Sequence, residues 1–249
     1  MNSLPAIRVL STNLNEITNW ILRGVQKGSV GEAVRLVNTY SLGLAVLDKQ
    51  YSRILSGPGI NIPDGKPLIL AHNFKLARNK GAAQIRGIDL LRSVLTASYK
   101  TQTRHFFVGS TDEVLEKMAF NIKKDFGLRN LEFYQPGIIS KSSVPSQILI
   151  SRIKESESNI VWVGLGTPNQ DFFAKELADL LPVIVIAVGA AFDFLSTEKK
   201  EAHPILIKFG VEWLFRLFSE PKRLMKRYLI ISPLWLTFLL SRKIYWESQ

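Results

Sequence analysis

The sequence predicts an α/β fold in which a mostly parallel sheet is covered by helices on both faces, as a Rossmann-like body with a C-terminal helical appendage. Short, nearly continuous apolar segments alternate with helical patterns over most of the 249 residues. Apolar residues make up 46% of the composition, which is enough for a buried core. After Ser196 the sequence becomes basic and rich in aromatic residues. We therefore expect an α/β body over residues 1–195 and a helical appendage over residues 196–249.

Each strand is predicted from a cluster of β-branched, aliphatic or aromatic residues, and each helix from apolar residues at helical spacing. The predicted strands are AIRVL (6–10), AVRLVN (33–38), RHFFVGS (104–110), LEFYQ (131–135), NIVWVGLG (159–166) and PVIVIAVG (182–189). Helices are predicted over residues 15–26, 41–55 and 110–126. At the start of the last helix, Ser110 and Glu113 have the spacing of a capping box.

The charge balance indicates an anionic partner. Lys and Arg outnumber Asp and Glu by 32 to 21, which gives a formal net charge of +11. Such a surplus favours nucleic acid, anionic lipid or a nucleotide-like substrate. The chain has no Cys, so disulfides and thiolate metal sites are excluded, in keeping with a reducing compartment. The first residues lack a basic segment followed by an apolar one, so we expect no secretion signal.

The longest apolar segment near the C-terminus is YLIISPLWLTFLL (228–240). A helix needs about 20 apolar residues to cross a bilayer, and Pro233 interrupts this one. Basic residues flank the segment, which favours a position on a membrane surface over a membrane crossing. A buried core helix is an equally good interpretation. Residues 196–249 hold ten Lys or Arg against five Glu, a net of +5.

A glycine-bearing turn follows the strand predicted at 159–166. Ligands of open α/β sheets bind beyond the carboxyl ends of the strands, where Gly164 and Gly166 lie. Thr167 and Pro168 then fit a helix cap and a first helical residue, and the N–H groups of such a helix start favour an anion.

Two features of this turn weaken the phosphate-binding interpretation. Asn169 stands where a dinucleotide-binding fingerprint has its third glycine, and no Walker lysine is present. Gln170 lies three residues after Thr167, which is also a capping-box spacing. A purely structural role for Gln170 is therefore as consistent with the spacing as a binding role.

Two aspartates stand in suggestive places, and each also has a structural explanation. Asp64 lies in a Pro-Asp-Gly turn, where a carboxylate often only stabilises the turn. Asp89 lies at the start of a helical segment, where it would serve as an N-cap.

Residues 212–228 (EWLFRLFSEPKRLMKRY) hold a cluster of cations. Pro221 is expected to begin a helix capped by Ser219. On that helix Arg223, Lys226 and Arg227 share one face by their spacing, and Arg216 lies on the preceding helix. A solvated basic face is the simpler explanation, but the aromatic residues between the arginines indicate a surface that is covered.

The combination of these stretches resembles the WecG/TagA/CpsF family of bacterial glycosyltransferases. The stretches, from about residue 6 to about residue 230, include PDG, RGIDLL, VGLGTPNQDFF, AVGAAFDFLS and GVEWLFRLFSEPKRLMKRYL. Members of that family transfer a sugar from a UDP-sugar to a membrane-embedded polyprenyl-diphosphate-linked sugar. They build teichoic acid linkage units, enterobacterial common antigen or exopolysaccharide repeats. The resemblance implies a body with a C-terminal appendage that contacts the membrane and helps to complete the active site.

The same resemblance implies roles for individual residues. Asp64 would be the base that accepts the proton of the acceptor hydroxyl, in a transfer that inverts the anomeric centre and gives a β-linked product. A carboxylate near a diphosphate is expected to have a raised pKa. The residues implied to bind the substrates are Asn38, Thr39, Gly164, Gly166, Gln170, Arg216, Arg223, Lys226 and Arg227. Guanidinium groups match phosphate oxygens, so the arginines would neutralise the departing diphosphate.

No metal or other cofactor is expected. The chain has no Asp-x-Asp motif, and its three His residues are scattered at His72, His105 and His203. We expect a UDP-sugar-dependent, metal-independent enzyme in the cytoplasm, peripheral on the inner face of the cell membrane. Its partners would be the donor, the lipid-linked acceptor and the anionic membrane surface, without nucleic acid. An exposed apolar appendage could equally dock on another copy of the chain.

The sequence departs from the family pattern at two places. Many members have a threonine and an asparagine after the second strand. Asn38 matches the asparagine, and whether Thr39 takes the place of the threonine stays open. Glu201 stands where an arginine is common. Both departures leave the donor sugar open among N-acetylmannosamine, its uronic acid and glucose. Asp193 lies at an apolar strand end, which favours a structural role over a catalytic one.

Two other classes of function remain as alternatives. A basic nucleic-acid-binding protein would account for the charge and the aromatic C-terminus. However, the aromatics there are mixed with long aliphatic residues such as Leu224, Leu229 and Leu236, which suit lipid or a core better than base stacking. A nicotinamide-dependent oxidoreductase would account for the glycine turn. However, this chain lacks the third glycine of the dinucleotide-binding fingerprint, and it lacks the acidic residue expected about 20 positions further on.

Overall fold

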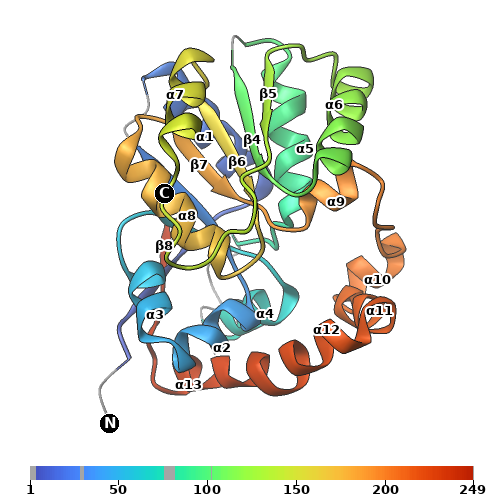
Figure 1. Cartoon of the computed structure of the whole chain (residues 1–249). Helices are drawn as coiled ribbons and strands as arrows, with labels where there is room; N and C mark the ends of the chain where they lie inside the picture. Colours follow the sequence, from blue (N-terminus) through green and yellow to red (C-terminus); the bar gives the residue numbers. More distant parts are fainter. Residues whose placement is uncertain (1–3, 29–30, 76–81, 102, 249) are drawn as a thin grey trace.

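A computed structural model describes residues 4–28, 31–75, 82–101 and 103–248 (Figure 1). It confirms the α/β fold with a parallel sheet between helices. The strands of the main sheet are β2 (Glu32–Val37), β3 (Ile60–Pro63), β4 (His105–Gly109), β5 (Leu131–Tyr134), β6 (Ile160–Gly164) and β7 (Ile184–Ala187). Their order is β3-β2-β7-β6-β4-β5, and every neighbouring pair is parallel. All their carboxyl ends therefore lie at one edge of the sheet.

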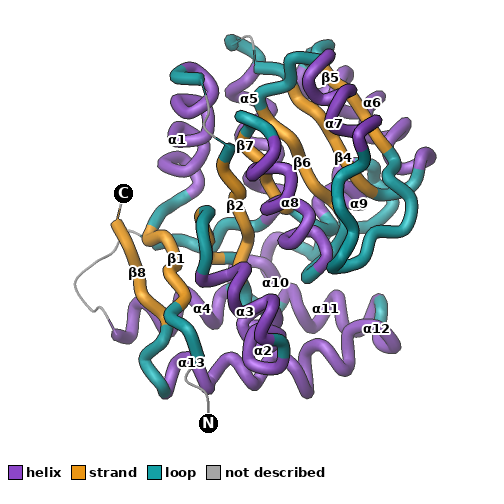
Figure 2. The backbone as a smooth tube through the Cα atoms, turned by 60° about the vertical axis from the view of Figure 1, so that its left-hand side comes forward, coloured by secondary structure: helices purple, strands orange, loops and turns teal. Residues whose placement is uncertain are grey.

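Helices cover both faces of this sheet (Figure 2). One face packs against α1 (Leu14–Gln26), α5 (Gly87–Ser98), α6 (Asp112–Phe126) and α9 (Ala191–Leu195), and the other against α7 (Gln147–Glu155) and α8 (Asn169–Leu180). Side chains of a strand alternate between the faces, so Phe107 joins the first core and its neighbours Phe106 and Val108 join the second. The near-continuous apolar strands are explained by this double coverage.

The first predicted strand lies outside the main sheet. β1 (Ile7–Ser11) is not part of the six-stranded sheet. It pairs in parallel with β8 (Ile244–Ser248), a strand that the sequence did not predict. Ile7 and Ile244 face each other in this pair and are buried with Phe238 and Trp235 in a third core. The end of the chain thus returns to its beginning.

Three local expectations need correction. The helix expected over 41–55 is two helices, α2 (Thr39–Leu47) and α3 (Lys49–Ser56), because the Asp48 side chain accepts the N–H groups of Gln50 and Tyr51 and so caps the second one. α6 is capped by Thr111, which accepts the Val114 N–H, and not by Ser110. β3 was not predicted, and it leads through the turn at Asp64 into α4 (Lys66–Lys75).

The segment after α9 runs along the carboxyl edge of the sheet (orange to red in Figure 1). It consists of α10 (Pro204–Phe209), α11 (Glu212–Ser219), α12 (Pro221–Met225), a π-helix η1 (Lys226–Ile231), a 3₁₀ helix η2 (Ser232–Trp235) and α13 (Leu236–Leu240). We call these elements the C-terminal helices. Pro221 begins α12 as expected, but the Ser219 hydroxyl donates to the Phe215 carbonyl and does not cap it.

The later C-terminal helices pack closely on α2. A Cβ added to Gly43 of α2 would collide with the Ile231 carbonyl, so only glycine allows this approach. The apolar segment 228–240 is partly buried: its side chains Trp235 and Phe238 lie in the core, while Leu229 and Leu240 are exposed. Contact of the exposed side chains with a membrane stays a prediction. Among the described residues, none of the helices has the length and apolar character needed to cross a membrane.

Candidate active site

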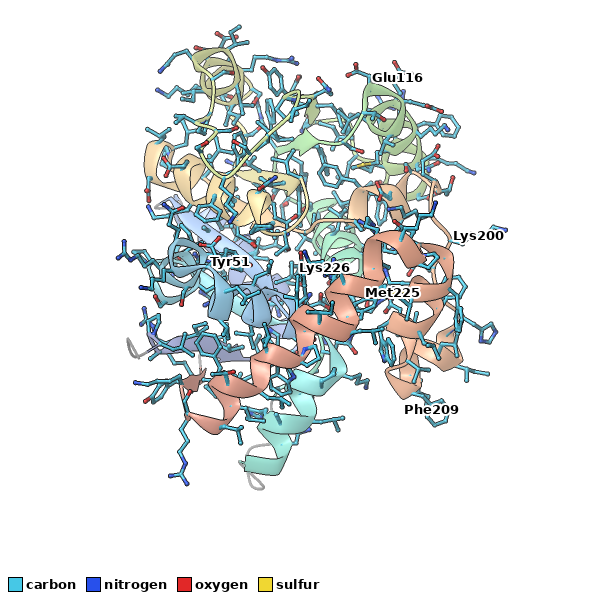
Figure 3. All side chains as sticks on the ribbon, turned by 60° about the horizontal axis from the view of Figure 1, so that its bottom comes forward. Tyr51, Glu116, Lys200, Phe209, Met225 and Lys226 are labelled. Carbon is cyan, nitrogen blue, oxygen red and sulfur yellow. The ribbon has the colours of Figure 1, made fainter. Side chains whose placement is uncertain are left out.

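A cavity of about 580 Å³ lies between the carboxyl edge of the main sheet and the C-terminal helices. The body contributes residues near the strand ends: Asn38 and Asp64 directly follow β2 and β3, and Gly166 and Gly189 come two residues after β6 and β7. The opposite wall includes Glu212, Trp213, Arg216, Arg223 and Arg227. Figure 3 looks onto this edge of the molecule, where the C-terminal helices cross in front of the sheet. The cavity therefore joins segments far apart in the sequence.

Asp64 lies at the body wall of this cavity, in the tight turn after β3. Its N–H donates to the Val37 carbonyl at 2.8 Å, and Gly65 follows with a φ of 106° that favours glycine. Asn38 Nδ2 donates to Asp64 Oδ2 at 3.3 Å. Burial raises the pKa of Asp64 to about 6. The Glu212 carboxylate adds to this effect on the pKa.

Asn38 holds two elements at once. Its Oδ1 accepts the N–H groups of Tyr40 and Ser41 at 3.0 and 3.1 Å, which caps α2. Its Nδ2 is then free to reach Asp64. Thr39, the first residue of α2, lines the cavity beside it.

The glycine turn is built differently from the expectation. Gln170 Oε1 accepts the Gly166 N–H at 3.1 Å, and Gln170 Nε2 lies 3.5 Å from the Thr167 hydroxyl. Gln170 thus closes the turn through Gly166 and not through the Thr167 N–H. α8 begins at Asn169 with Pro168 in the cap position, and the Thr167–Pro168 peptide bond is cis.

The two glycines of this turn have different surroundings. Gly166, with a φ of 77°, lines the cavity with Gln170. Gly164 is not among the lining residues, and a Cβ there would meet the Phe192 ring at 2.6 Å. Gly164 therefore allows α9 to pack against β6, which is a structural reason for its presence.

Two arginines from the C-terminal helices reach into the cavity. Arg216 lies with its guanidinium carbon 5.2 Å from the centre of the Phe194 ring, and Arg227 lies 4.1 Å from that of Tyr40. Within the described part of the chain, neither forms an ion pair at contact distance, although both lower the pKa of Asp64 by their charge. Burial lowers the pKa of Arg227, and a guanidinium stays charged all the same.

The other two predicted cations differ from this pair. Arg223 lines the cavity but is 54% exposed and pairs with Glu220, with Nε 2.6 Å from Oε2. Lys226 is exposed and is not one of the lining residues (labelled in Figure 3). The spacing argument put both on one helical face with Arg227; Arg223 and Arg227, four residues apart, do line the same cavity, whereas Lys226 does not.

The lining residues that sequence reasoning missed include Tyr40, Arg86, Glu212 and Trp213. The last three lie in the stretches RGIDLL and EWLFR, in which the sequence pattern indicated only Asp89 and the arginines as candidates. Asp89 lies in the first turn of α5 and pairs with Arg86, so it is not the N-cap.

Two further acidic residues have partners of their own. Glu201, where an arginine is common in the resembling family, pairs with Arg86 at 3.0 Å and with Arg92 at 2.7 Å. Asp193 pairs with Lys199 at 2.7 Å. No group of three or more His, Asp or Glu side chains in the described ranges could hold a metal ion. Metal independence stays a prediction.

This chain is similar to known proteins over nearly its whole length. The model of the glycosyl transferase WecG/TagA/CpsF family matches residues 3–249. The N-acetylglucosaminyldiphosphoundecaprenol N-acetyl-beta-D-mannosaminyltransferase of Bacillus spizizenii strain W23 is 28% identical over 200 residues, covering 80% of this chain and 75% of that protein. A protein of the same name from Bacillus subtilis strain 168 is 26% identical over 238 residues, covering 95% and 90%.

Proposed function

This chain belongs to the glycosyl transferase WecG/TagA/CpsF family, and on that premise we propose that it moves a sugar from a UDP-sugar to a polyprenyl-diphosphate-linked saccharide. The observation that carries the proposal is the arrangement around Asp64. A carboxyl group of raised pKa shares the cavity with two arginines, Arg216 and Arg227, that form no ion pair with any carboxylate of the described residues. The cavity thus offers a base beside sites for phosphate oxygens.

The proposed reaction is a direct displacement. The acceptor hydroxyl oxygen forms a bond to the anomeric carbon of the donor while the bond from that carbon to the UDP oxygen breaks. Asp64 takes the hydroxyl proton, and UDP leaves with the electron pair of the broken bond. One displacement inverts the anomeric centre. Arg216 and Arg227 bind the diphosphate, whose charge grows as the bond breaks, with Arg223 at the cavity mouth.

The remaining predicted residues position these groups. Asn38 holds the Asp64 carboxyl by its hydrogen bond and, with Thr39, forms the wall next to it. Gln170 fixes the Gly166 turn against the donor. We propose that Gly164 does not contact the substrates and only allows α9 to pack against β6. We propose likewise that Lys226 does not contact the donor and contributes only to the outer surface of the protein.

The outer surface of the C-terminal helices suits an anionic membrane. Exposed apolar side chains there include Phe209, Phe218, Met225, Leu229, Ile230 and Leu240. Exposed cations, among them Lys222 and Lys226, lie between them. We call these residues the proposed membrane-binding patch. Apolar side chains flanked by lysines bind the interface of anionic lipids. We therefore place the enzyme on the inner face of the cell membrane, where its lipid-linked acceptor is anchored and UDP-sugars are available. In this proposal residues 1–195 form the catalytic body and residues 196–249 close the site.

The printed names of the two Bacillus relatives suggest the first substrates to try. Both name N-acetylglucosaminyl-diphosphoundecaprenol as acceptor and N-acetylmannosamine as the transferred sugar. We propose this acceptor class, and UDP-N-acetylmannosamine as the first donor candidate. Family membership removes the reason for the nucleic-acid and oxidoreductase alternatives, since the glycine turn and the basic helices both belong to the proposed transferase site.

The test is UDP release by the purified full chain with detergent and an N-acetylglucosaminyl-diphosphopolyprenol acceptor. The donors are UDP-N-acetylmannosamine, its uronic acid and UDP-glucose, each with and without EDTA. We expect acceptor-dependent release with one donor and no effect of EDTA. Release with none of a wider panel of UDP-sugars would overturn the proposal, and loss with EDTA would overturn metal independence alone.

A further inference from the structure

We propose that Arg86 is a positioning residue for the transfer reaction, which holds the start of α11 against the body so that the arginine wall of the cavity stays opposite Asp64. The inference rests on the proposed function of the cavity. It concerns a residue that touches the C-terminal helices and not the reacting atoms.

Arg86 binds three carboxylates from three separate parts of the chain. Its Nη1 lies 3.3 Å from Asp89 of its own helix, its Nη2 lies 3.0 Å from Glu201 of the segment after α9, and its Nε lies 3.1 Å from Glu212 of α11. The side chain of Arg86 is only 10% exposed and that of Glu212 only 16%. A buried, hydrogen-bonded pair is costly to break, because removing one partner leaves the other charge without compensation.

The helices held by this cluster have no fully buried side chain of their own. Neither α10 nor α11 contains a buried residue, so apolar packing contributes little to their position. Figure 1 shows them beside the body, joined to α9 by an extended segment. A second cation, Lys199, bridges Asp193 of α9 and Glu220 at the end of α11. Its side chain is 34% exposed, so its contribution is weaker.

The contact to Glu212 has a direct consequence for the cavity. Glu212 lies in the first turn of α11, four residues before Arg216, so the two side chains point to the same side of the helix. Fixing Glu212 on Arg86 therefore fixes the direction in which Arg216 enters the cavity. The position of one arginine of the body thus sets the position of a proposed diphosphate ligand.

Arg86 also balances the charge that acts on Asp64. The ionisable side chains that line the cavity with Asp64 are Tyr40, Lys66, Arg86, Glu212, Arg216, Arg223, Arg227 and Tyr228. Of these, Glu212 raises the pKa of Asp64, while Arg216 and Arg227 lower it. Without Arg86, the Glu212 charge would be uncompensated and the pKa of Asp64 would rise further.

The test compares Arg86→Gln, Arg86→Gln combined with Glu212→Gln, and Glu201→Gln with the wild-type chain. The matched control is Arg104→Gln, which removes an arginine paired with Glu157 at the amino end of β4. Two quantities are measured: hydrogen exchange of residues 204–219, and the midpoint of the acidic limb of kcat/KM against pH in the UDP-release assay.

We expect Arg86→Gln to speed exchange in 204–219 at least tenfold and to move the midpoint to higher pH. The double variant returns the midpoint towards wild type, because the uncompensated carboxylate is gone. Glu201→Gln gives a smaller increase in exchange, and it serves alone if Arg86→Gln does not fold. Arg104→Gln changes neither quantity. Unchanged exchange in Arg86→Gln and in Glu201→Gln would overturn the inference, as would a midpoint shift that Glu212→Gln does not reverse. If the wild-type chain releases no UDP, the proposed function fails, while the exchange data still decide whether Arg86 holds the helices.

Discussion

Asn38 Nδ2 donates a hydrogen bond to Asp64 Oδ2 at 3.3 Å while Asn38 Oδ1 caps α2. One side chain therefore links the end of β2, the start of α2 and the proposed base. Because the two functions use different atoms, substitutions can separate them.

The first prediction separates the cap from the contact to the base. Asn38→Ser keeps a good N-cap but loses the donor to Asp64, so the protein should stay folded while kcat falls. Asn38→Ala loses both and should also lose about 1 kcal/mol of unfolding free energy. Thermal unfolding and UDP release measure the two effects. Wild-type kcat in Asn38→Ser would show that the contact has no role.

The second prediction concerns pH. The pKa of Asp64 is about 6, raised by burial, and a base must be deprotonated to accept a proton. The kcat/KM should therefore fall as the pH drops below about 6, about tenfold per pH unit. A rate profile of the wild-type chain from acidic to neutral pH measures this limb. A flat profile through this range would contradict the assignment of Asp64 as base.

The third prediction distinguishes the cavity arginines from the exposed cation. Arg227→Gln and Arg216→Gln should each lower kcat/KM by about 100-fold, because each removes a donor for the leaving diphosphate. Arg227→Lys should recover only part of this loss, since a single ammonium does not match the guanidinium fork. Lys226→Gln is the matched control in detergent and should leave kcat/KM close to wild type. Equal losses in all of these variants would indicate a general charge effect.

The fourth prediction concerns the proposed membrane-binding patch of the protein. Lys222→Gln with Lys226→Gln should weaken binding to vesicles of phosphatidylcholine and phosphatidylglycerol, by about 1 kcal/mol for each lysine at low salt. Phe218→Ser with Leu240→Ser should weaken binding to these vesicles at high salt too, where apolar contacts dominate. Co-sedimentation measures both. Unchanged binding in both variants would place the membrane contact elsewhere, and a shift to monomers in the second would assign the apolar side chains to a contact between copies.

Local patterns were sufficient to predict five of the six strands of the main sheet, all except β3, whereas the roles of the residues at its carboxyl edge were implied by the family resemblance. The runs around Phe107, Trp162 and Val185 are apolar throughout because both faces of the sheet are covered, which identified a parallel α/β fold. Asp64, Asn38 and Gln170 each follow a strand of this sheet, so parallel topology alone brings them to one edge.

The features that could not be predicted depend on contacts between distant segments. β8 forms only because residues 244–248 meet β1 at the other end of the chain, and no local pattern encodes that pairing. In the sequence, nothing distinguishes Arg86 and Glu212 from surface charges, and only the fold brings Arg86 Nε within 3.1 Å of Glu212 Oε2. In contrast, the division of 41–55 into two helices was predictable from the sequence, because Asp48 is a residue type that favours the N-cap position of a new helix.

The most direct test of the account is sugar transfer by Asp64→Asn, with Asp179→Asn as control because Asp179 is half exposed and pairs with Lys175 on the surface of α8. Transfer of labelled sugar to the lipid-linked acceptor is measured together with the Kd of UDP. The account predicts that Asp64→Asn lowers the transfer rate by about 10²- to 10⁴-fold with little change in the Kd, while Asp179→Asn matches wild type. A wild-type transfer rate in Asp64→Asn would contradict the role of Asp64 as the base and with it the proposed mechanism.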